Sequence, residues 1–171
     1  MKYLRIGFVL AIGAGLLFVS SAMYLRASGP DMVQQMRDRT EIEALMFRYA
    51  RALDTMDADA YASVYAPDGQ FGTGPNAVKG TAALKEMIAR GRTDSRVRIG
   101  SMYHLTTDPH FEFPAKDQAV AHFYYVTVIN GAKQGDQAQV QAGYGIDEFV
   151  RLNGKWLIKS RNVNAGATNS R

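Results

Sequence analysis

At 171 residues the chain is long enough for one compact domain with a short appendage. It contains no cysteine, which excludes disulfides, thiolate metal ligands and cysteine nucleophiles. Three of its 20 Lys and Arg residues lie before residue 27, which leaves 17 against 16 Asp and Glu in the remainder. A domain so close to neutral gives no support for a nucleic-acid partner.

The N-terminus carries an uncharged apolar run over residues 6–25, preceded by Lys2 and Arg5. The run is long enough to span a bilayer, and the leading positive charges predict that the domain after it is exported. It also fits a signal peptide with small residues at 20–22, so a retained membrane anchor and a cleaved leader both stay open. We expect three parts: a leader with its linker (1–29), a folded domain that works in the periplasm or outside the cell (30–164), and a flexible tail (165–171).

The first predicted helix begins at a capping box formed by Thr40 and Glu43 and ends near Asp54. Its apolar positions have the spacing of a helix packed on a core: Ile42, Leu45, Met46, Tyr49 and Leu53. The helix macrodipole disfavours a carboxylate at Asp54. This residue therefore either has another task, such as holding a base, or caps the following helix, as Asp57 could.

The remaining elements are predicted in chain order. A short helix over 57–65 is followed by a turn at 67–69, a strand around Phe71, a glycine-rich loop over 72–80 and a third helix over 81–90. Four strand-like runs then cover 97–113, 119–131, 137–152 and 155–163. Helices followed by long antiparallel strands predict an α+β fold, in which a curved sheet and helices on one face enclose a pocket.

The dipeptide Asn153-Gly154 predicts a two-residue hairpin turn. Counting outward from it pairs Glu148 with Lys159 and places Asp147 and Arg161 on opposite faces, unless a bulge intervenes. Asp147 is then expected in a structural cluster with Arg151 and Trp156. A group of arginines (Arg90, Arg92, Arg96 and Arg98) lacks interleaved aromatics and is interpreted as a solvated loop.

With these elements in place, residues 37–164 resemble the SnoaL-like group of the nuclear transport factor two superfamily. The resemblance depends on the order and spacing of five motifs: Tyr49-(x4)-Asp54, residues 65–69, Gly80-Thr81, Tyr103-His104 and Asp147-(x3)-Arg151-(x2)-Gly154-(x)-Trp156. It implies a cone-shaped α+β barrel with three N-terminal helices, a fold that often assembles as a homodimer or homotrimer through its sheet.

Within that group the pattern is similar to the cofactor-independent dehydratases that act on scytalone and on bile acids. This similarity implies that His104 transfers protons, that Asp54 hydrogen-bonds His104, and that Tyr49 polarises a substrate oxygen. A late-strand arginine of the bile-acid enzymes matches Arg161. Three further tyrosines are candidates for lining the substrate pocket: Tyr103, Tyr124 and Tyr144.

The chain also departs from these enzymes. Leu53 stands where scytalone dehydratase has a tyrosine, and residues 126–128 contain no counterpart of its second histidine. Residues 70–74 lack the basic aspartate of the ketosteroid isomerases of this fold, which argues against isomerase activity. His110 and His122 lack the family match of His104 and are interpreted as structural or surface residues. The spacings of the three histidines, 6 and 12 residues, match no metal motif. Neither a metal nor a cofactor is expected.

The sequence therefore favours a dehydratase acting on a hydrophobic hydroxy-carbonyl compound, of polyketide or steroid type, through general acid–base chemistry at His104. An isomerase or cyclase is the enzymatic alternative. A domain of the same fold that only binds an apolar small molecule, or only forms a dimer, is the non-enzymatic one. If the leader is retained, residues 6–25 also make the membrane a partner.

Overall fold

The computed structural model describes residues 31–93, 101–131 and 135–165. The leader and linker, Arg96, Arg98, the start of the first predicted strand run and the end of the tail lie outside these residues. Within the described ranges, no helix is long and apolar enough to cross a membrane. The chain divides into two units, Met1–Asp38 and Arg39–Arg171. In the first, residues 31–38 are helical and Gln34 hydrogen-bonds the Asp38 carboxylate at 2.9 Å.

The second unit opens with a helix over residues 39–54. The predicted apolar face is buried at Ile42, Leu45, Met46 and Tyr49 and packs in the main core. The predicted capping box is wrong, because Thr40 already lies within a helical run rather than at its start. No glycine or proline interrupts residues 31–40, and Met, Gln and Arg all favour helix there.

Two further helices follow, a short one and a longer one. Helix α2, Ala58–Ser63, begins at Asp57, whose side chain accepts a hydrogen bond from the Ala60 amide at 3.0 Å. Helix α3, Thr81–Thr93, extends three residues beyond its predicted end and packs against α2 and β1. Because Asp57 caps the N-terminus of α2, Asp54 does not cap this helix.

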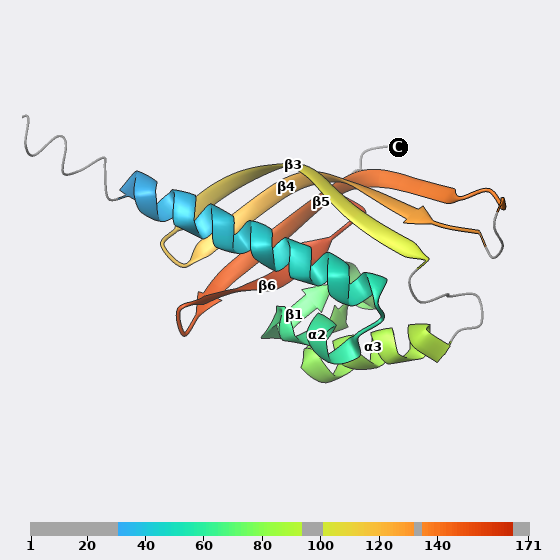
Figure 1. Cartoon of the computed structure of the whole chain (residues 1–171). Helices are drawn as coiled ribbons and strands as arrows, with labels where there is room; N and C mark the ends of the chain where they lie inside the picture. The colour runs from blue at the N-terminus through green and yellow to red at the C-terminus, as the bar shows by residue number, and fades with distance from the viewer. Residues whose placement is uncertain (1–30, 94–100, 132–134, 166–171) are drawn as a thin grey trace, which may run out of the picture. The chain divides into compact units, whose positions relative to one another are not determined.

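The sheet has six strands in the order β2-β1-β6-β5-β4-β3. Their bounds are Tyr65–Phe71, Val78–Lys79, Met102–Ala115, Gln118–Ile129, Gln139–Leu152 and Lys155–Asn162, for β1 to β6. All neighbours are antiparallel except β1 and β6, which are parallel. The sheet is curved and open, with β3 at one edge, and the helix of residues 39–54 crosses it (Figure 1). The predicted α+β class and curved, mainly antiparallel sheet are confirmed.

Two local predictions need correction. Residues 67–69 do not turn the chain into a strand; they lie within β1, where its register against β6 shifts between Tyr65 and Gln70. The loop over 72–80 contains a 3-10 turn, Gly74–Asn76, and strand β2. Gly69 is required at the register shift, because a Cβ there would meet the Ile158 carbonyl oxygen at 2.8 Å.

The β5–β6 hairpin contains a bulge, the condition under which the positions counted from Asn153-Gly154 would change face. Arg151 faces Trp156 as predicted, but the register shifts between Glu148 and Phe149. Beyond the shift, Glu148 faces Ser160 rather than Lys159. The extra residue returns the next side chains of β6 to the opposite face, because side chains alternate along a strand.

Candidate functional site

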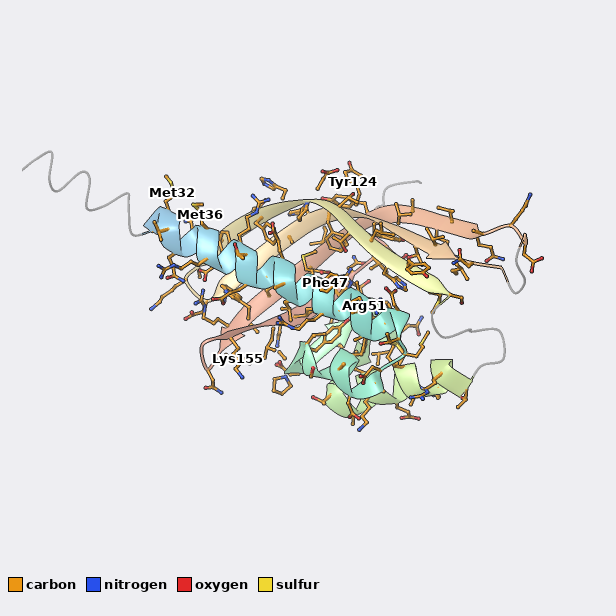
Figure 2. The ribbon with its side chains drawn as sticks, viewed as in Figure 1. Met32, Met36, Phe47, Arg51, Tyr124 and Lys155 are labelled. Carbon is orange, nitrogen blue, oxygen red and sulfur yellow. The ribbon has the colours of Figure 1, made fainter. Side chains whose placement is uncertain are left out.

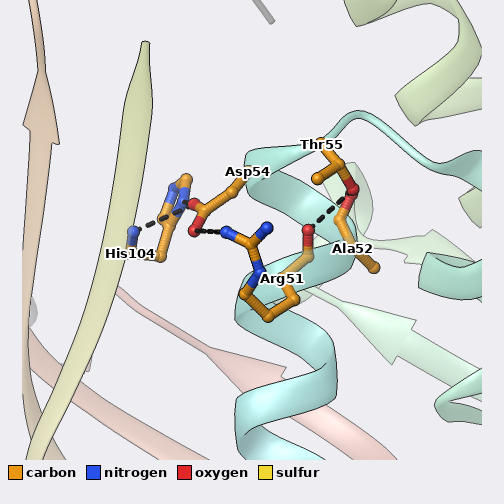
Figure 3. Close-up of polar contacts among 5 residues, drawn as sticks. All are labelled: Arg51, Ala52, Asp54, Thr55 and His104. Carbon is orange, nitrogen blue, oxygen red and sulfur yellow. Dashed lines mark hydrogen bonds and ion pairs between the residues drawn. The ribbon is translucent and has the colours of Figure 1, made fainter. Parts of the chain in front are cut away.

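Asp54 and His104 meet where the helix of residues 39–54 ends beside β3 (Figure 3). Oδ1 of Asp54 lies 2.8 Å from Nδ1 of His104 and accepts the His104 backbone amide at 3.0 Å. Its other oxygen, Oδ2, lies 3.6 Å from Nη1 of Arg51. Asp54 is buried and the His104 side chain is about one-fifth exposed. The carboxylate therefore fixes both the backbone and the ring of His104.

This contact determines what the imidazole can do. A carboxylate accepting at Nδ1 favours the tautomer with its proton on Nδ1, which leaves the Nε2 lone pair available as a base. When Nε2 takes up a proton, Nδ1 can keep its hydrogen bond to Asp54. The pair thus has the geometry of a general base that can later act as a general acid.

His104 lines a cavity of about 320 Å³ between the helix and the inner face of the sheet. Tyr49 and Leu53 contribute from the helix, and Arg161 from β6. The remaining wall combines five apolar side chains with five that carry polar groups: Thr106, Tyr125, Thr127, Gln141 and Asn164. A cavity that combines apolar side chains with convergent polar groups is typical of a small-molecule site.

Arg161, which lines this cavity, belongs to a buried ion pair. Nη1 of Arg161 hydrogen-bonds Oδ2 of Asp147, and both side chains are almost completely buried. The guanidinium carbon lies 3.9 Å from the centre of the Tyr49 ring and 4.8 Å from that of Phe123. Asp147 is therefore not in a cluster with Arg151 and Trp156. The bulge places it on the same face as Arg161, while the Arg151 guanidinium lies over the Trp156 ring.

Tyr49 and Arg161 are both suited to donate hydrogen bonds into the cavity. Burial raises the pKa of Tyr49, partly offset by the Arg161 charge, so its hydroxyl keeps its proton. Nε of Arg161 and Oδ1 of Asp147 are buried without a hydrogen-bond partner in the described part of the chain. Buried polar atoms of this kind usually have a partner, so the Nε–H group of Arg161 is a candidate donor to a bound substrate.

Burial raises the pKa of Asp147 to about 7 from 3.8, against the opposing effect of Arg161. The folded state then binds this proton more tightly than the unfolded state does. We expect its stabilising contribution to be complete below pH 3.8 and to be lost as the pH rises towards 7. Urea unfolding between pH 4 and 8 should show the free energy of unfolding falling with pH more steeply in the wild type than in Asp147→Asn. Parallel profiles would contradict the raised pKa.

The structure does not bring Tyr103, Tyr124 and Tyr144 to this cavity. Their strand positions place them on the outer face of the sheet, where Tyr124 packs on Tyr144 at 5.6 Å between ring centres. The side chains at 103 and 124 are 46% and 60% exposed. Side chains alternate along strands, so these residues share the face opposite the cavity.

The cavity instead receives three residues that were not among the predicted site residues. Tyr125 and Thr127 line it from β4, and Gln141 lines it from β5. Period-two alternation could have found the first two, because they share a face with buried Phe123. Nothing in the local sequence marks Gln141, which faces Thr127 through strand pairing.

The other two histidines lie away from the cavity. Nδ1 of His122 is 2.7 Å from the Tyr144 hydroxyl, and Nε2 is 3.6 Å from Glu112. His110 is largely exposed. Across the described ranges, no three His, Cys, Asp or Glu side chains are grouped so that they could hold a metal ion.

A larger cavity, of about 620 Å³, lies over the outer face of the sheet beside the ion pair of Asp68 and Lys159. It shares no lining residue with the His104 cavity. We place the candidate site in the smaller cavity, because only that one combines a base, its carboxylate partner and buried hydrogen-bond donors.

The fold and the family match define the class of protein. The chain matches the SnoaL-like domain over residues 34–162 and belongs to that family, whose fold is that of the nuclear transport factor two superfamily. No curated protein matches the chain.

Among solved structures, a protein of unknown function from Mycobacterium tuberculosis is 26% identical, with a TM-score of 0.68 over 77% of this chain and 73% of that one. A candidate scytalone dehydratase from Novosphingobium aromaticivorans is 20% identical, with a TM-score of 0.65 over 77% and 85%. A hexachlorocyclohexane dehydrochlorinase from Novosphingobium barchaimii is 20% identical, with a TM-score of 0.62 over 76% and 87%. At such identities the last two support the fold alone.

Proposed function

We propose that this protein is a dehydratase that removes water from a hydrophobic β-hydroxy carbonyl compound, with its own side chains supplying the acid and the base. The observation that carries the proposal is the 2.8 Å contact between Asp54 and Nδ1 of His104 at the wall of the smaller cavity. The names of two structural neighbours, a dehydratase and a dehydrochlorinase, describe eliminations and agree with this class.

The proposed reaction begins with proton removal. Nε2 of His104 takes the proton from the carbon next to the substrate carbonyl, and the electron pair moves onto the carbonyl oxygen. Tyr49 and Arg161 donate hydrogen bonds to this developing enolate, which is the charge that such preorganised donors stabilise most. Both groups lie in the same cavity as His104.

The second step expels the hydroxyl group. The enolate re-forms the carbonyl and the carbon–carbon double bond as the bond to the β-hydroxyl breaks. The protonated His104 gives its proton to the departing oxygen, which leaves as water. The products are an unsaturated carbonyl compound and water, and His104 returns to its starting state with Asp54 still bound to Nδ1.

Asp54→Asn should lower kcat by roughly 10²- to 10⁴-fold while leaving the fold intact. An amide can donate to Nδ1 and so stabilise the wrong tautomer, the effect known when the aspartate of a serine-protease triad is changed. The measurement is steady-state turnover with circular dichroism of both proteins. Arg51→Gln is the control, because Arg51 contacts the other Asp54 oxygen and not the imidazole; a similar loss in both variants would argue against tautomer control.

The proposal is tested by a thermal-shift screen of the whole chain against steroids, aromatic polyketides and smaller β-hydroxy ketones, with product analysis of each stabilising compound. Loss of water from a stabilising compound, abolished in His104→Ala, would support the dehydratase. A compound that stabilises the protein and is recovered unchanged would favour the domain that only binds. Rearrangement without loss of water would favour an isomerase or cyclase.

A further inference from the structure

His104 also borders a second cavity, of about 460 Å³, between the helix of residues 39–54 and β3. The helix contributes one wall and β3 the other: Glu43, Met46, Phe47 and Ala50 face His104, Leu105, Thr106 and Pro109. Three of these residues, His104, Leu105 and Thr106, line the first cavity as well. The candidate base therefore lies where the two cavities adjoin.

The chemistry of this second cavity is apolar. Phe47 and Leu105 border it and remain 66% and 48% exposed. Figure 2 labels Phe47 on the helix. Glu43, its one carboxylate, pairs with Arg39 at 2.8 Å. No unpaired fixed charge is thus available among the described lining residues to attract an ion, and burial of apolar surface would be the main source of affinity.

We propose that the second cavity binds an apolar tail of the substrate, whose hydroxy-carbonyl end reacts in the first cavity. This inference builds on the proposed function and narrows its substrate class to elongated molecules, with an apolar extension beyond the reacting carbonyl. The size of the first cavity supports it. At about 320 Å³ that cavity is near the lower limit for small-molecule sites, so a steroid- or polyketide-sized substrate would extend past His104.

Chain length in a series of ligands tests this inference directly. The probes are 2-alkanones from six to twelve carbons, which carry the carbonyl but no hydroxyl and so bind without reacting. Each methylene buried in the second cavity should lower Kd about fourfold, as expected for transfer of one CH₂ from water. Isothermal titration calorimetry of the full chain gives the slope of affinity against length.

Two variants locate the tail. Phe47→Ala should flatten the slope for the longer ketones and leave the shortest unaffected. Tyr124→Ala is the matched control, an exposed aromatic on the outer sheet face, and should keep the wild-type slope. An equal slope in wild type and Phe47→Ala, or no gain of affinity with length, would overturn the inference. A dimer that becomes a monomer in Phe47→Ala would also overturn it, because a second copy would then cover the cavity.

Turnover of the matching 4-hydroxy-2-alkanones separates this inference from the proposed function. If the short hydroxy ketones lose water through His104 and chain length changes neither Kd nor kcat/KM, the function stands and the tail site is wrong. If length dependence appears in binding but no hydroxy ketone is dehydrated, the tail site stands and the dehydratase is in doubt.

Discussion

His104→Ala is expected to lower the turnover of a dehydrated substrate by roughly 10²- to 10⁴-fold, the usual contribution of a general acid–base group. Nε2 is the atom that we propose moves the proton, and Asp54 has no other imidazole to orient in the described part of the cavity. Steady-state kcat, with the free energy of unfolding measured alongside, separates lost chemistry from lost folding. A fall of only about threefold would remove His104 from the mechanism.

His122→Ala provides a closely matched control. His122 is also a partly exposed strand histidine, with Nδ1 hydrogen-bonded at 2.7 Å, but its partner is Tyr144 on the outer face. Removing it deletes an imidazole and a hydrogen bond of similar geometry without touching the cavity. Turnover should therefore stay close to that of the wild type. If both variants lost activity equally, general loosening of the sheet would explain the result better than acid–base chemistry.

The sequence predicts the elements well because their signals are local. The apolar spacing of Ile42, Leu45 and Tyr49 indicates the buried face of the helix, and Asn153-Gly154 indicates the hairpin. The predicted helix start is wrong for a local reason too. A capping box does not fix the first residue of a helix when the residues before it also favour helix.

The candidate site depends on contacts that no local pattern records. Asp54 and His104 are 50 positions apart, and their approach depends on how the helix ends beside the sheet edge. Spacing alone allows Asp54 either to hold a base or to cap the next helix. Only the resemblance to the dehydratases indicates the pairing with His104. Their catalytic roles, and those of Tyr49 and Arg161, stay predictions.

The ion pair of Asp147 and Arg161 shows the limit of counting residues. Side chains change face at every position, so one bulge reverses the face of every residue beyond it. The register shift next to Phe149 has this effect and brings Arg161 to the cavity, facing Asp147. The sequence around Lys159 and Ser160 contains no glycine or other bulge signal, and only the pairing of the two strands reveals the shift.

Asp147→Ala is expected to lower the free energy of unfolding by about 3–5 kcal/mol, because it leaves the Arg161 guanidinium buried without its counter-charge. Asp147 is fully buried and Arg161 nearly so, and the Tyr49 and Phe123 rings lie against the guanidinium. Cation–π contacts of this kind contribute only about 0.5–2 kcal/mol and cannot replace the carboxylate. Urea unfolding at pH 8 measures the change, because this pH lies above the Asp147 pKa of about 7 and the carboxyl is then mainly ionised.

Two comparisons show whether the loss comes from the uncompensated charge. Asp68→Ala breaks the ion pair with Lys159 at the surface and should change stability far less, because solvent screens exposed pairs. Replacing both partners, in Asp147→Leu with Arg161→Met, should recover much of the stability, since apolar residues of similar volume often substitute well for a buried pair. A double variant less stable than Asp147→Ala would mean that Arg161 stabilises the core without its carboxylate. Recovered stability combined with lost turnover would instead indicate that the cavity keeps this costly buried charge for a substrate oxygen rather than for folding.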